Sequence, residues 1–480
     1  MAQTELNDYG KILDKFAEII GSKHVLTDPA EMRPFLTDWR GLYQGSAFAI
    51  VKPGNTQEVS EIVRICASEN IGIVPQGGNT GLVGGSIPFE TGNEIVLSLK
   101  RLNQVREVDP LSDTMTVDAG VTLKTVQEAA ESVDRLFPLS LASEGSCTIG
   151  GNLATNAGGT AVLAYGNARD LVLGLEVVLA DGRVWNGLGK LRKDNTGYDL
   201  RNVFIGSEGT LGIITAVVLK LFPAPKSRST AICGLPSPEN ALQLFTLAKK
   251  KSGSALTTFE LIPRLGIEMV VQHIPNNRDP LSTRHDWYVL MELSSAGNDG
   301  LSKVFEQLLA EAFEQELVSD AVIASSLDQR DDFWRLRESL SDAQGFEGGS
   351  IKHDISVPLA SVPQLITNVN RDVELLIPGI RPVPFGHLGD GNLHFNMTQP
   401  IGADKSAFLA RWDEVNEIVY GYTLKVNGSI SAEHGIGRLK RGMLEKVKDP
   451  VAYDIMRALK LTFDPKNILN RGKVVSSKLG

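Results

Sequence analysis

Three glycine-rich segments between residues 75 and 215 constrain the fold of this chain more than any other feature. The first, PQGGNTGLVGGS at residues 75–86, has five glycines in twelve residues and follows the strand-like segment IGIV. Glycine accepts positive φ and lets backbone N–H groups approach an anion closely. α/β proteins bind phosphates at such strand ends. Taken alone, this segment also suits a flexible surface loop.

The second segment is EGSCTIGGNLATNAGGTAVLAYG at residues 144–166, and the third is GSEGTLGIIT at residues 206–215. The first segment matches neither a Walker loop nor a G-x-G-x-x-G dinucleotide fingerprint. Three such segments in a row are not typical of surface turns. Together they indicate a long, pyrophosphate-bearing cofactor wrapped by backbone.

The pattern around these segments predicts an α+β protein of several domains, because 480 residues exceed what one core usually organises. We expect a helical lead-in at 1–45, a cofactor domain at 46–225, a second α+β domain at 226–425, and a returning segment at 426–480. The break falls in FPAPKSRST, residues 222–230. Helices are expected at 6–20, after Asp28, and from 56 to 70 with Thr56 as its cap.

Composition narrows the class of protein. The net charge of −9 excludes a general nucleic-acid binder but allows a local basic pocket for an anionic substrate. Three widely spaced cysteines form neither a disulfide framework nor a zinc knuckle. No secretory signal, transit peptide or apolar run of membrane-spanning length is evident, and Gly480 follows the Ser-Lys-Leu near the C-terminus. These features predict a bacterial-type cytoplasmic enzyme.

A metal site is predicted from FGHLGDGNLHFN, residues 385–396. Asp390-Gly391 is a strong signal for a two-residue hairpin turn. Counting outward from that turn pairs His387 with His394, and directly opposed Cβ atoms lie roughly 4.5–5.5 Å apart. Two imidazoles would then share one cation, with Asn396 on the same face.

The segment SAEHGIG, residues 431–437, adds the carboxylate of Glu433 next to His434. Two histidines and one carboxylate would bind Zn²⁺ or Mn²⁺ and leave positions open for a substrate. The alternative is that these histidines cap turns or fill a core, which is more plausible for one histidine than for this whole set.

Candidate substrate-binding residues precede this region. FWRLRESLSDAQG is expected to be one helix with Arg337 and Ser341 four residues apart, and IKHDISVP a strand carrying Lys352. Arginine suits bidentate carboxylate binding, and lysine supplies a point charge. Each charge alone is also compatible with a solvated surface.

These motifs, in this order, resemble the vanillyl-alcohol oxidase / p-cresol methylhydroxylase family of FAD proteins, from about residue 40 to 475. The nearest resemblance is to its branch of D-2-hydroxyglutarate and D-lactate dehydrogenases. It implies a two-part FAD-binding domain with an α+β cap and a C-terminal segment that returns to the flavin. The residues that it assigns to FAD are Pro75, Gly77, Gly78, Asn79, Thr80, Gly81, Gly84, Gly85, Gly145, Ser146, Thr148, Gly150, Gly151, Asn156, Gly158, Gly159 and Ile213.

The same resemblance implies His387, His394 and Glu433 as ligands of a divalent metal and His434 as the catalytic base. It further implies Arg337, Ser341, Lys352 and Asn396 as substrate-binding residues. Some family members bind FAD covalently through a histidine in the first loop, where this chain has Asn79 and Thr80, so non-covalent FAD is expected.

We therefore expect a dehydrogenase that oxidises a D-2-hydroxy acid, D-2-hydroxyglutarate or D-malate, by hydride transfer to flavin N5. The expected electron acceptor is a protein or a quinone, with electron-transfer flavoprotein typical of the branch. D-lactate or glycolate dehydrogenase and a non-catalytic FAD-binding subunit are the alternatives. The metal, the acceptor and the oligomeric state, including a homodimer, stay open.

Overall fold

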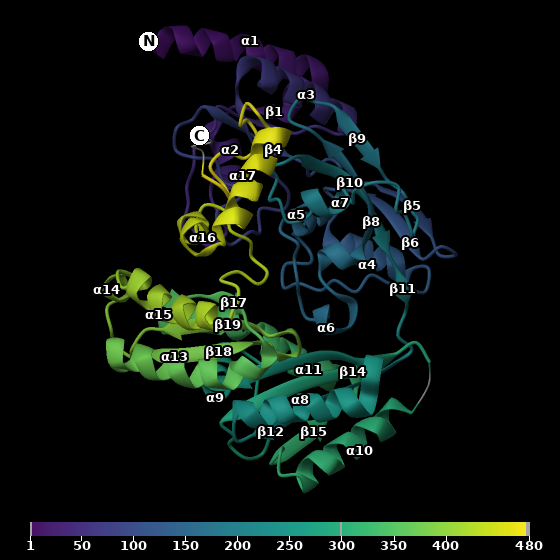
Figure 1. Cartoon of the computed structure of the whole chain (residues 1–480), viewed down its shortest axis with the longest axis vertical. Coiled ribbons are helices and arrows are strands. Elements are labelled where there is room, and N and C mark those ends of the chain that lie inside the picture. The colour runs from purple at the N-terminus through teal and green to yellow at the C-terminus, as the bar shows by residue number, and fades with distance from the viewer. Residues whose placement is uncertain (1, 298–299, 477–480) are drawn as a thin grey trace. The chain divides into compact units, whose positions relative to one another are not determined.

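The computed structural model describes residues 2–297 and 300–476, and the chain forms two compact units (Figure 1). The first unit contains Met1–Ala157, Asn167–Pro223 and Glu433–Gly480, and the second contains Gly158–Gly166 and Ala224–Ala432. The Ser-Lys-Leu-Gly end at 477–480, considered above as a targeting signal, lies outside the described residues.

The first unit opens with a four-stranded sheet in the order β1, β2, β4, β3. Strands β2, β4 and β3 are parallel, whereas β1 is antiparallel to β2. The strands and their helices are β1 (Val25–Leu26), β2 (Ala49–Val51), β3 (Gly72–Gln76), β4 (Glu94–Ser98), α1 (Ala2–Ile20), α2 (Pro29–Leu36) and α3 (Thr56–Glu69). Every residue of β2 and β4 is buried, as expected for parallel strands covered on both faces.

The second helix begins after Asp28 as predicted, and the Asp28 side chain caps α2 by accepting hydrogen bonds from the backbone N–H groups of Ala30 and Glu31. The predicted cap of α3 is wrong by one residue. Asn55 caps the helix by accepting from the Glu58 N–H at 2.9 Å. The Thr56 hydroxyl instead donates to Glu176 at 2.6 Å.

A five-stranded antiparallel sheet in the order β5, β6, β10, β8, β9 completes the first unit. Its strands are β5 (Val105–Asp109), β6 (Thr114–Asp118), β8 (Val172–Val178), β9 (Val184–Gly187) and β10 (Ile213–Lys220). β7 (Arg135–Leu136) and β11 (Phe222–Pro223) form a separate short pair. The helices are α4 (Leu123–Glu131), α5 (Ile149–Ala154), α7 (Arg201–Phe204), α16 (Arg441–Val447) and α17 (Pro450–Phe463).

The C-terminal segment is tied into this first unit by a buried lysine of α17. Lys460 Nζ donates to the Thr210 carbonyl at 2.9 Å and the Leu469 carbonyl at 2.7 Å, and it pairs with Asp464. Leu469 in turn forms a parallel bridge with Ile73 of β3. Residues 460–469 therefore lie beside the third glycine-rich segment and the strand that leads into the first.

The second unit is built on an eight-stranded antiparallel sheet, in the order β15, β12, β14, β13, β18, β19, β16, with β17 also pairing β19. The strands are β12 (Ser227–Leu235), β13 (Leu256–Pro263), β14 (Trp287–Ser295), β15 (Asp320–Ile323), β16 (Ser350–Ile351), β17 (Asp354–Ser356), β18 (Arg381–His387) and β19 (Asn392–Thr398).

Helices flank this sheet, as Figure 1 shows. α8 (Pro238–Ser252) and α10 (Leu301–Glu314) pack on each other and on β12 and β14, and α13 (Val362–Leu376) packs on α15 (Trp412–Lys425). α9 (Arg264–His273), α11 (Leu327–Glu338) and α12 (Leu340–Ala343) share a core cluster with the sheet that includes Ile262, Leu290, Phe333 and Phe385. α6 (Val162–Tyr165) and α14 (Lys405–Leu409) are short additions.

Two predicted elements near the candidate substrate residues are interrupted. The expected helix with Arg337 and Ser341 on one face ends at Glu338, and Ser341 belongs to α12. The expected strand around Lys352 is divided, because Lys352 and His353 lie between β16 and β17. The mixed helix-and-sheet fold itself is as predicted.

The predicted hairpin register is also wrong. β18 and β19 are joined by the 3-10 turn Leu388–Asp390 and Gly391, so Phe385, and not His387, is opposite His394. Asp390 Oδ1 accepts from the Asn392 N–H at 3.0 Å, and the Gly391 N–H donates to Leu388. These bonds close a four-residue turn in place of the two-residue turn.

Candidate flavin and metal site

Parts of the three glycine-rich segments that belong to the first unit contact one another. A Cβ on Gly77 would lie 2.2 Å from Thr148 Oγ1, and one on Gly78 would lie 2.1 Å from the Ser146 carbonyl oxygen. A Cβ on Gly209 would lie 3.1 Å from Pro75. Because backbone atoms leave no room at Gly78, only glycine permits this approach of the first two segments.

Several buried polar atoms around these segments have no hydrogen-bond partner among the described residues. They include Gln76 Oε1 at the end of β3, Thr148 Oγ1 and Asn470 Oδ1. Buried polar atoms are nearly always paired in folded proteins, so such a group marks a place where a polar ligand fits. Together with the glycine surfaces, these atoms suit the polar portions of FAD.

Two asparagines assigned to FAD by resemblance hold the protein backbone with their side chains. Asn79, at φ +60°, donates to the carbonyls of Pro34 and Thr37 and accepts from Ser86. Asn156, at φ +53°, accepts from the Arg169 N–H at 3.0 Å. Their side chains therefore shape the loops, and a cofactor would meet their backbone.

The other residues that the resemblance assigns to FAD lie in different surroundings. Gly81 and Gly145 face open space, and a Cβ on Gly84 would meet Tyr43 and Arg438. Gly151 lies in α5, and buried Ile213 begins β10. Gly158 and Gly159 belong to the short 158–166 segment of the second unit. The remaining assigned residues are Thr80, Gly85, Ser146 and Gly150, all in the first unit.

Glu208 in the third segment, which the sequence reading did not single out, fastens the segment that follows His434. It lies at φ +52°, and its carboxylate accepts from the N–H groups of Ile436 at 2.7 Å and Gly437 at 2.8 Å. Burial raises the pKa of Glu208, against the effect of these two donors. A Cβ on Gly435 would lie 2.8 Å from the same carboxylate, which explains a glycine there.

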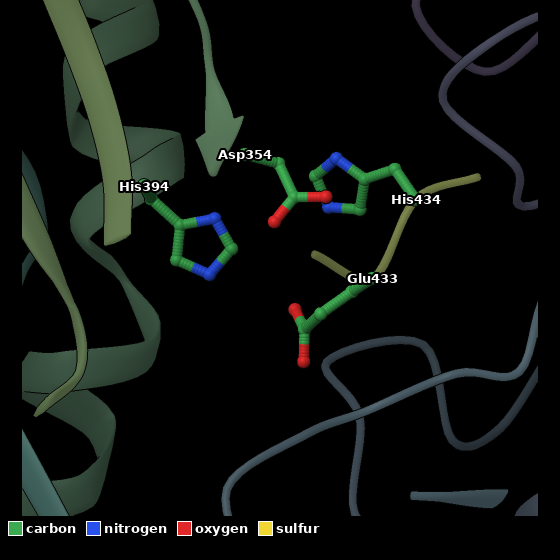
Figure 2. Close-up of side chains that lie close together, drawn as sticks. All are labelled: Asp354, His394, Glu433 and His434. Carbon is green, nitrogen blue, oxygen red and sulfur yellow. The ribbon is translucent and has the colours of Figure 1, made fainter. Parts of the chain in front are cut away.

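Four side chains form a group able to hold a metal ion. Asp354 and His394 are opposite each other on β17 and β19, and Glu433 and His434 complete the group (Figure 2). One ligand atom from each lies within 4.8 Å of the others. The Ala432 N–H donates to the Asp354 carbonyl at 3.3 Å, so the chain itself brings the next two residues toward β17.

This group contains two of the three predicted ligands, His394 and Glu433, together with the predicted base His434. It adds Asp354, which the sequence reading missed although HDIS carries a carboxylate beside a histidine. Imidazole and carboxylate donors are those that Zn²⁺ and Mn²⁺ accept, so the residues fit a divalent cation.

The third predicted ligand, His387, has a different set of contacts. Its ring centroid lies 5.7 Å from that of His394, and its Nδ1 lies 2.6 Å from Glu260 Oε1. Glu260 also accepts from Arg337 Nε at 2.8 Å. Burial opposes the charge of Glu260, but His387 and Arg337 outweigh burial and lower the pKa of Glu260 to about 2.

The predicted substrate residues all belong to the second unit, and Arg337 is part of this network. Arg337 is buried, and its guanidinium lies 4.9 Å from the centre of the Phe385 ring. Lys352 Nζ donates to the Ser341 carbonyl at 3.3 Å, so these two residues are neighbours. Asn396 is buried and donates to Gln344 Oε1 at 2.7 Å, which removes one of its amide hydrogens from other use.

Comparison with known proteins agrees with this arrangement. Residues 47–187 match the FAD binding domain family, and residues 224–474 match the family described as FAD linked oxidases, C-terminal domain. p-Cresol methylhydroxylase has the same fold, with a TM-score of 0.77 at 17% identity over 98% of this chain and 97% of that one. Alkyldihydroxyacetonephosphate synthase gives 0.71 at 19% identity over 96% and 84%. The fold and the two family matches, at residues 47–187 and 224–474, therefore define an FAD-dependent oxidoreductase.

Relatives among characterised proteins narrow the class. The D-2-hydroxyglutarate dehydrogenase of Arabidopsis thaliana is 37% identical over 98% of this chain and 82% of its own length, and that of Danio rerio is 39% identical over 95% and 83%. A D-2-hydroxyglutarate–pyruvate transhydrogenase of Saccharomyces cerevisiae is 36% identical over 97% and 95%. The chain belongs to the D-2-hydroxyglutarate dehydrogenase family and is an FAD-dependent oxidoreductase acting on CH–OH groups. The non-catalytic subunit considered above is excluded.

The expected bacterial-type cytoplasmic location is wrong. The Arabidopsis, zebrafish and rat relatives are all named as mitochondrial enzymes. The expectation rested on seeing no leader pattern, and the lack of such a pattern does not determine the compartment. Among the described residues, no helix is long and apolar enough to cross a membrane.

Proposed function

We propose that this enzyme oxidises D-2-hydroxyglutarate to the corresponding 2-oxo acid, with D-malate as a shorter alternative, and that turnover requires a divalent metal, Zn²⁺ or Mn²⁺. The observation that carries the proposal is the group Asp354, His394, Glu433 and His434. His394 of this group, on β19, lies close to His387 of the Arg337–Glu260–His387 network. The names of the relatives support the substrate.

We propose His387, His394 and Glu433 as the ligands and His434 as the base. If Asp354, His394, Glu433 and His434 all bound one tetrahedral cation, no position would stay open for a substrate. With His387 and not Asp354 as a ligand, Glu433 is the only carboxylate among the three proposed ligands. A divalent cation then keeps a net positive charge that attracts an anionic substrate. Metal-binding histidines commonly donate their second ring nitrogen to a carboxylate, and His387 has Glu260 for that purpose.

Bound FAD supplies the hydride acceptor, and a bound divalent cation supplies a Lewis acid for the carboxylate and hydroxyl at C1 and C2. The chain's own residues do the rest. His434 accepts the C2 hydroxyl proton. Arg337 and Lys352 pair with the distal carboxylate, Ser341 and Asn396 line its path, and burial of that carboxylate without such partners would be costly.

A substrate panel with anaerobic flavin bleaching tests the reaction. D-2-hydroxyglutarate should bleach the flavin faster than D-lactate or glycolate, and chelation should abolish bleaching while the flavin spectrum persists. Full activity after verified metal removal would exclude the metal role. Asp354→Asn should retain the metal, whereas loss of the metal would identify Asp354 as a ligand in place of His387.

Lys352→Met tests the distal site better than Arg337→Ala, because truncating Arg337 would leave Glu260 charged and buried. Losing a charged hydrogen bond costs about 1.5–3 kcal/mol, so kcat/KM for D-2-hydroxyglutarate should fall roughly ten- to a hundredfold. D-Lactate should be little affected. Lys303→Met on the exposed face of α10 is the matched control. Equal losses for both substrates would show that Lys352 does not bind the distal group.

We propose that a protein or quinone, with electron-transfer flavoprotein the first choice, reoxidises the flavin. D-Lactate dehydrogenase is the second candidate function, because a relative of Schizosaccharomyces pombe with 36% identity is named a putative D-lactate dehydrogenase. The same substrate panel distinguishes the two.

A further inference from the structure

One carboxylate joins the proposed substrate arginine to a proposed metal ligand. Glu260 lies on β13 opposite His387 of β18 and is completely buried. Its Oε1 is 2.6 Å from His387 Nδ1, and its Oε2 receives Arg337 Nε at 2.8 Å and Nη2 at 2.7 Å. Both oxygens are therefore occupied by residues from two other elements, β18 and α11.

The fold also contains a close counterpart of this ion pair. Glu292, on β14, is buried and accepts from Arg330 Nε at 2.8 Å, Trp334 Nε1 at 3.2 Å and Thr230 Oγ1 at 2.8 Å. Arg330 and Arg337 are seven residues apart on α11, which is about two helical turns and the same face. Thr258 is opposite Glu292 and two residues from Glu260, so both carboxylates point to the helix.

The two pairs differ in one respect. The Glu292 carboxylate accepts from a hydroxyl, an indole and an arginine that the proposed reaction does not use, whereas His387 and Arg337, which contact the Glu260 carboxylate, both have proposed roles in it. The Glu292 pair thus represents the structural role alone, and any additional role of Glu260 should appear as a difference between the two.

We infer that Glu260 is a positioning residue that orients His387 for the metal and Arg337 for the distal carboxylate at the same time. This inference rests on the function proposed above. With Nδ1 engaged by Glu260, the ring presents Nε2 to a cation. With Nε and Nη2 engaged, the guanidinium presents Nη1 to the substrate. A single side chain therefore couples metal retention to the preference for a dicarboxylate.

The test compares Glu260→Gln with Glu292→Gln in the holoenzyme. Each substitution keeps the shape of the side chain and removes a buried carboxylate that pairs with an arginine of α11, so both should lower the melting temperature. Arg330 keeps its ion pair with Asp331, whereas Arg337 is itself buried, so the loss should be no smaller in Glu260→Gln. Only Glu260→Gln should weaken zinc binding, by about 10- to 100-fold in competition with a zinc indicator, as expected for a residue that supports a metal ligand. Only Glu260→Gln should reduce the ratio of kcat/KM for D-2-hydroxyglutarate over D-lactate, by about tenfold or more.

Glu260→Asp provides a second variant if Glu260→Gln does not fold. It keeps the negative charge beside Arg337 but is one methylene shorter, so it cannot reach both partners as the native side chain does. Lower zinc affinity or a lower substrate ratio is expected. Zinc affinity and substrate ratio equal to those of Glu292→Gln, in whichever Glu260 variant folds, would overturn the inference.

Measurements on the wild-type enzyme separate the positioning role of Glu260 from the proposed function. If wild-type enzyme is reduced by D-2-hydroxyglutarate in a zinc-dependent manner but the Glu260 variants match the control, only the positioning role is wrong. If wild-type enzyme neither binds zinc nor prefers the dicarboxylate, the proposed function is wrong, and the positioning role is overturned with it.

Discussion

Glu208→Gln should loosen the segment that carries His434 without removing that segment's own side chains. The carboxylate of Glu208 accepts two backbone N–H groups, from Ile436 and Gly437, one on each oxygen. A glutamine keeps the shape but offers only one oxygen. Its amide nitrogen would face a second N–H donor, because both partners of Glu208 are donors.

The size of the effect follows from this count. One charge-assisted hydrogen bond is lost, and one buried N–H is left facing another donor. Hydrogen bonds to charged groups contribute about 1.5–3 kcal/mol. If opening of residues 433–440 is local, this free energy converts to amide exchange roughly ten- to a hundredfold faster at Ile436 and Gly437.

Hydrogen exchange followed by mass spectrometry measures this directly on a peptide that covers residues 433–440. Glu58→Gln is the matched control, because Glu58 also accepts from a backbone N–H, that of Gly54 at 2.6 Å, and lies in the same unit. Exchange in residues 433–440 should rise only in Glu208→Gln. Unchanged exchange there, or the same rise in both variants, would refute the idea that Glu208 fastens this segment.

Three further outcomes are expected. Acid precipitation should release the flavin into the supernatant, because the first glycine-rich segment contains no histidine for covalent attachment; colour that remains in the pellet would contradict this. His434→Ala should slow flavin reduction by about 10²–10⁴-fold, the usual contribution of a general base, with zinc content unchanged; an emptied metal site would instead identify His434 as a ligand. Cys66 and Cys233 should resist thiol reagents until the protein is denatured, since burial raises the pKa of both thiols; rapid labelling of the native enzyme at either position would show that these thiols are accessible.

The sequence was most informative where local chemistry decides the structure. Asp28 before a proline predicts the start of α2 because a side-chain cap and a fixed proline φ act within one turn. The glycine-rich segments were found because their composition directly reflects close backbone contacts, such as that of Gly78 with Ser146. The contacts of Glu208 were not found, since its partners lie 228 and 229 residues away.

The predicted hairpin failed because a two-residue turn was inferred from Asp390-Gly391 alone. Gly391 does have a positive φ, of +81°, but Asp390 bonds forward to Asn392 and Gly391 bonds back to Leu388, which lengthens the turn. A turn that is longer by two residues moves the pairing by two positions. His387 consequently stays on the same face as before, because side chains alternate with a period of two, and remains near His394 despite the wrong register.

The network around Glu260 can be predicted from the sequence only in part. LTTFELIP reads as a strand on which Thr258, Glu260 and Ile262 share one face, and a carboxylate on a buried face requires a cation or strong donors. That requirement is visible in the sequence, but the identity of the partners is not. Arg337 and His387 lie 77 and 127 residues further along the chain, and only the pairing of β13 with β18 and the packing of α11 bring them to one carboxylate. A buried acidic residue in an apolar strand therefore predicts that a polar network exists, and the topology of the sheet decides which residues the network joins.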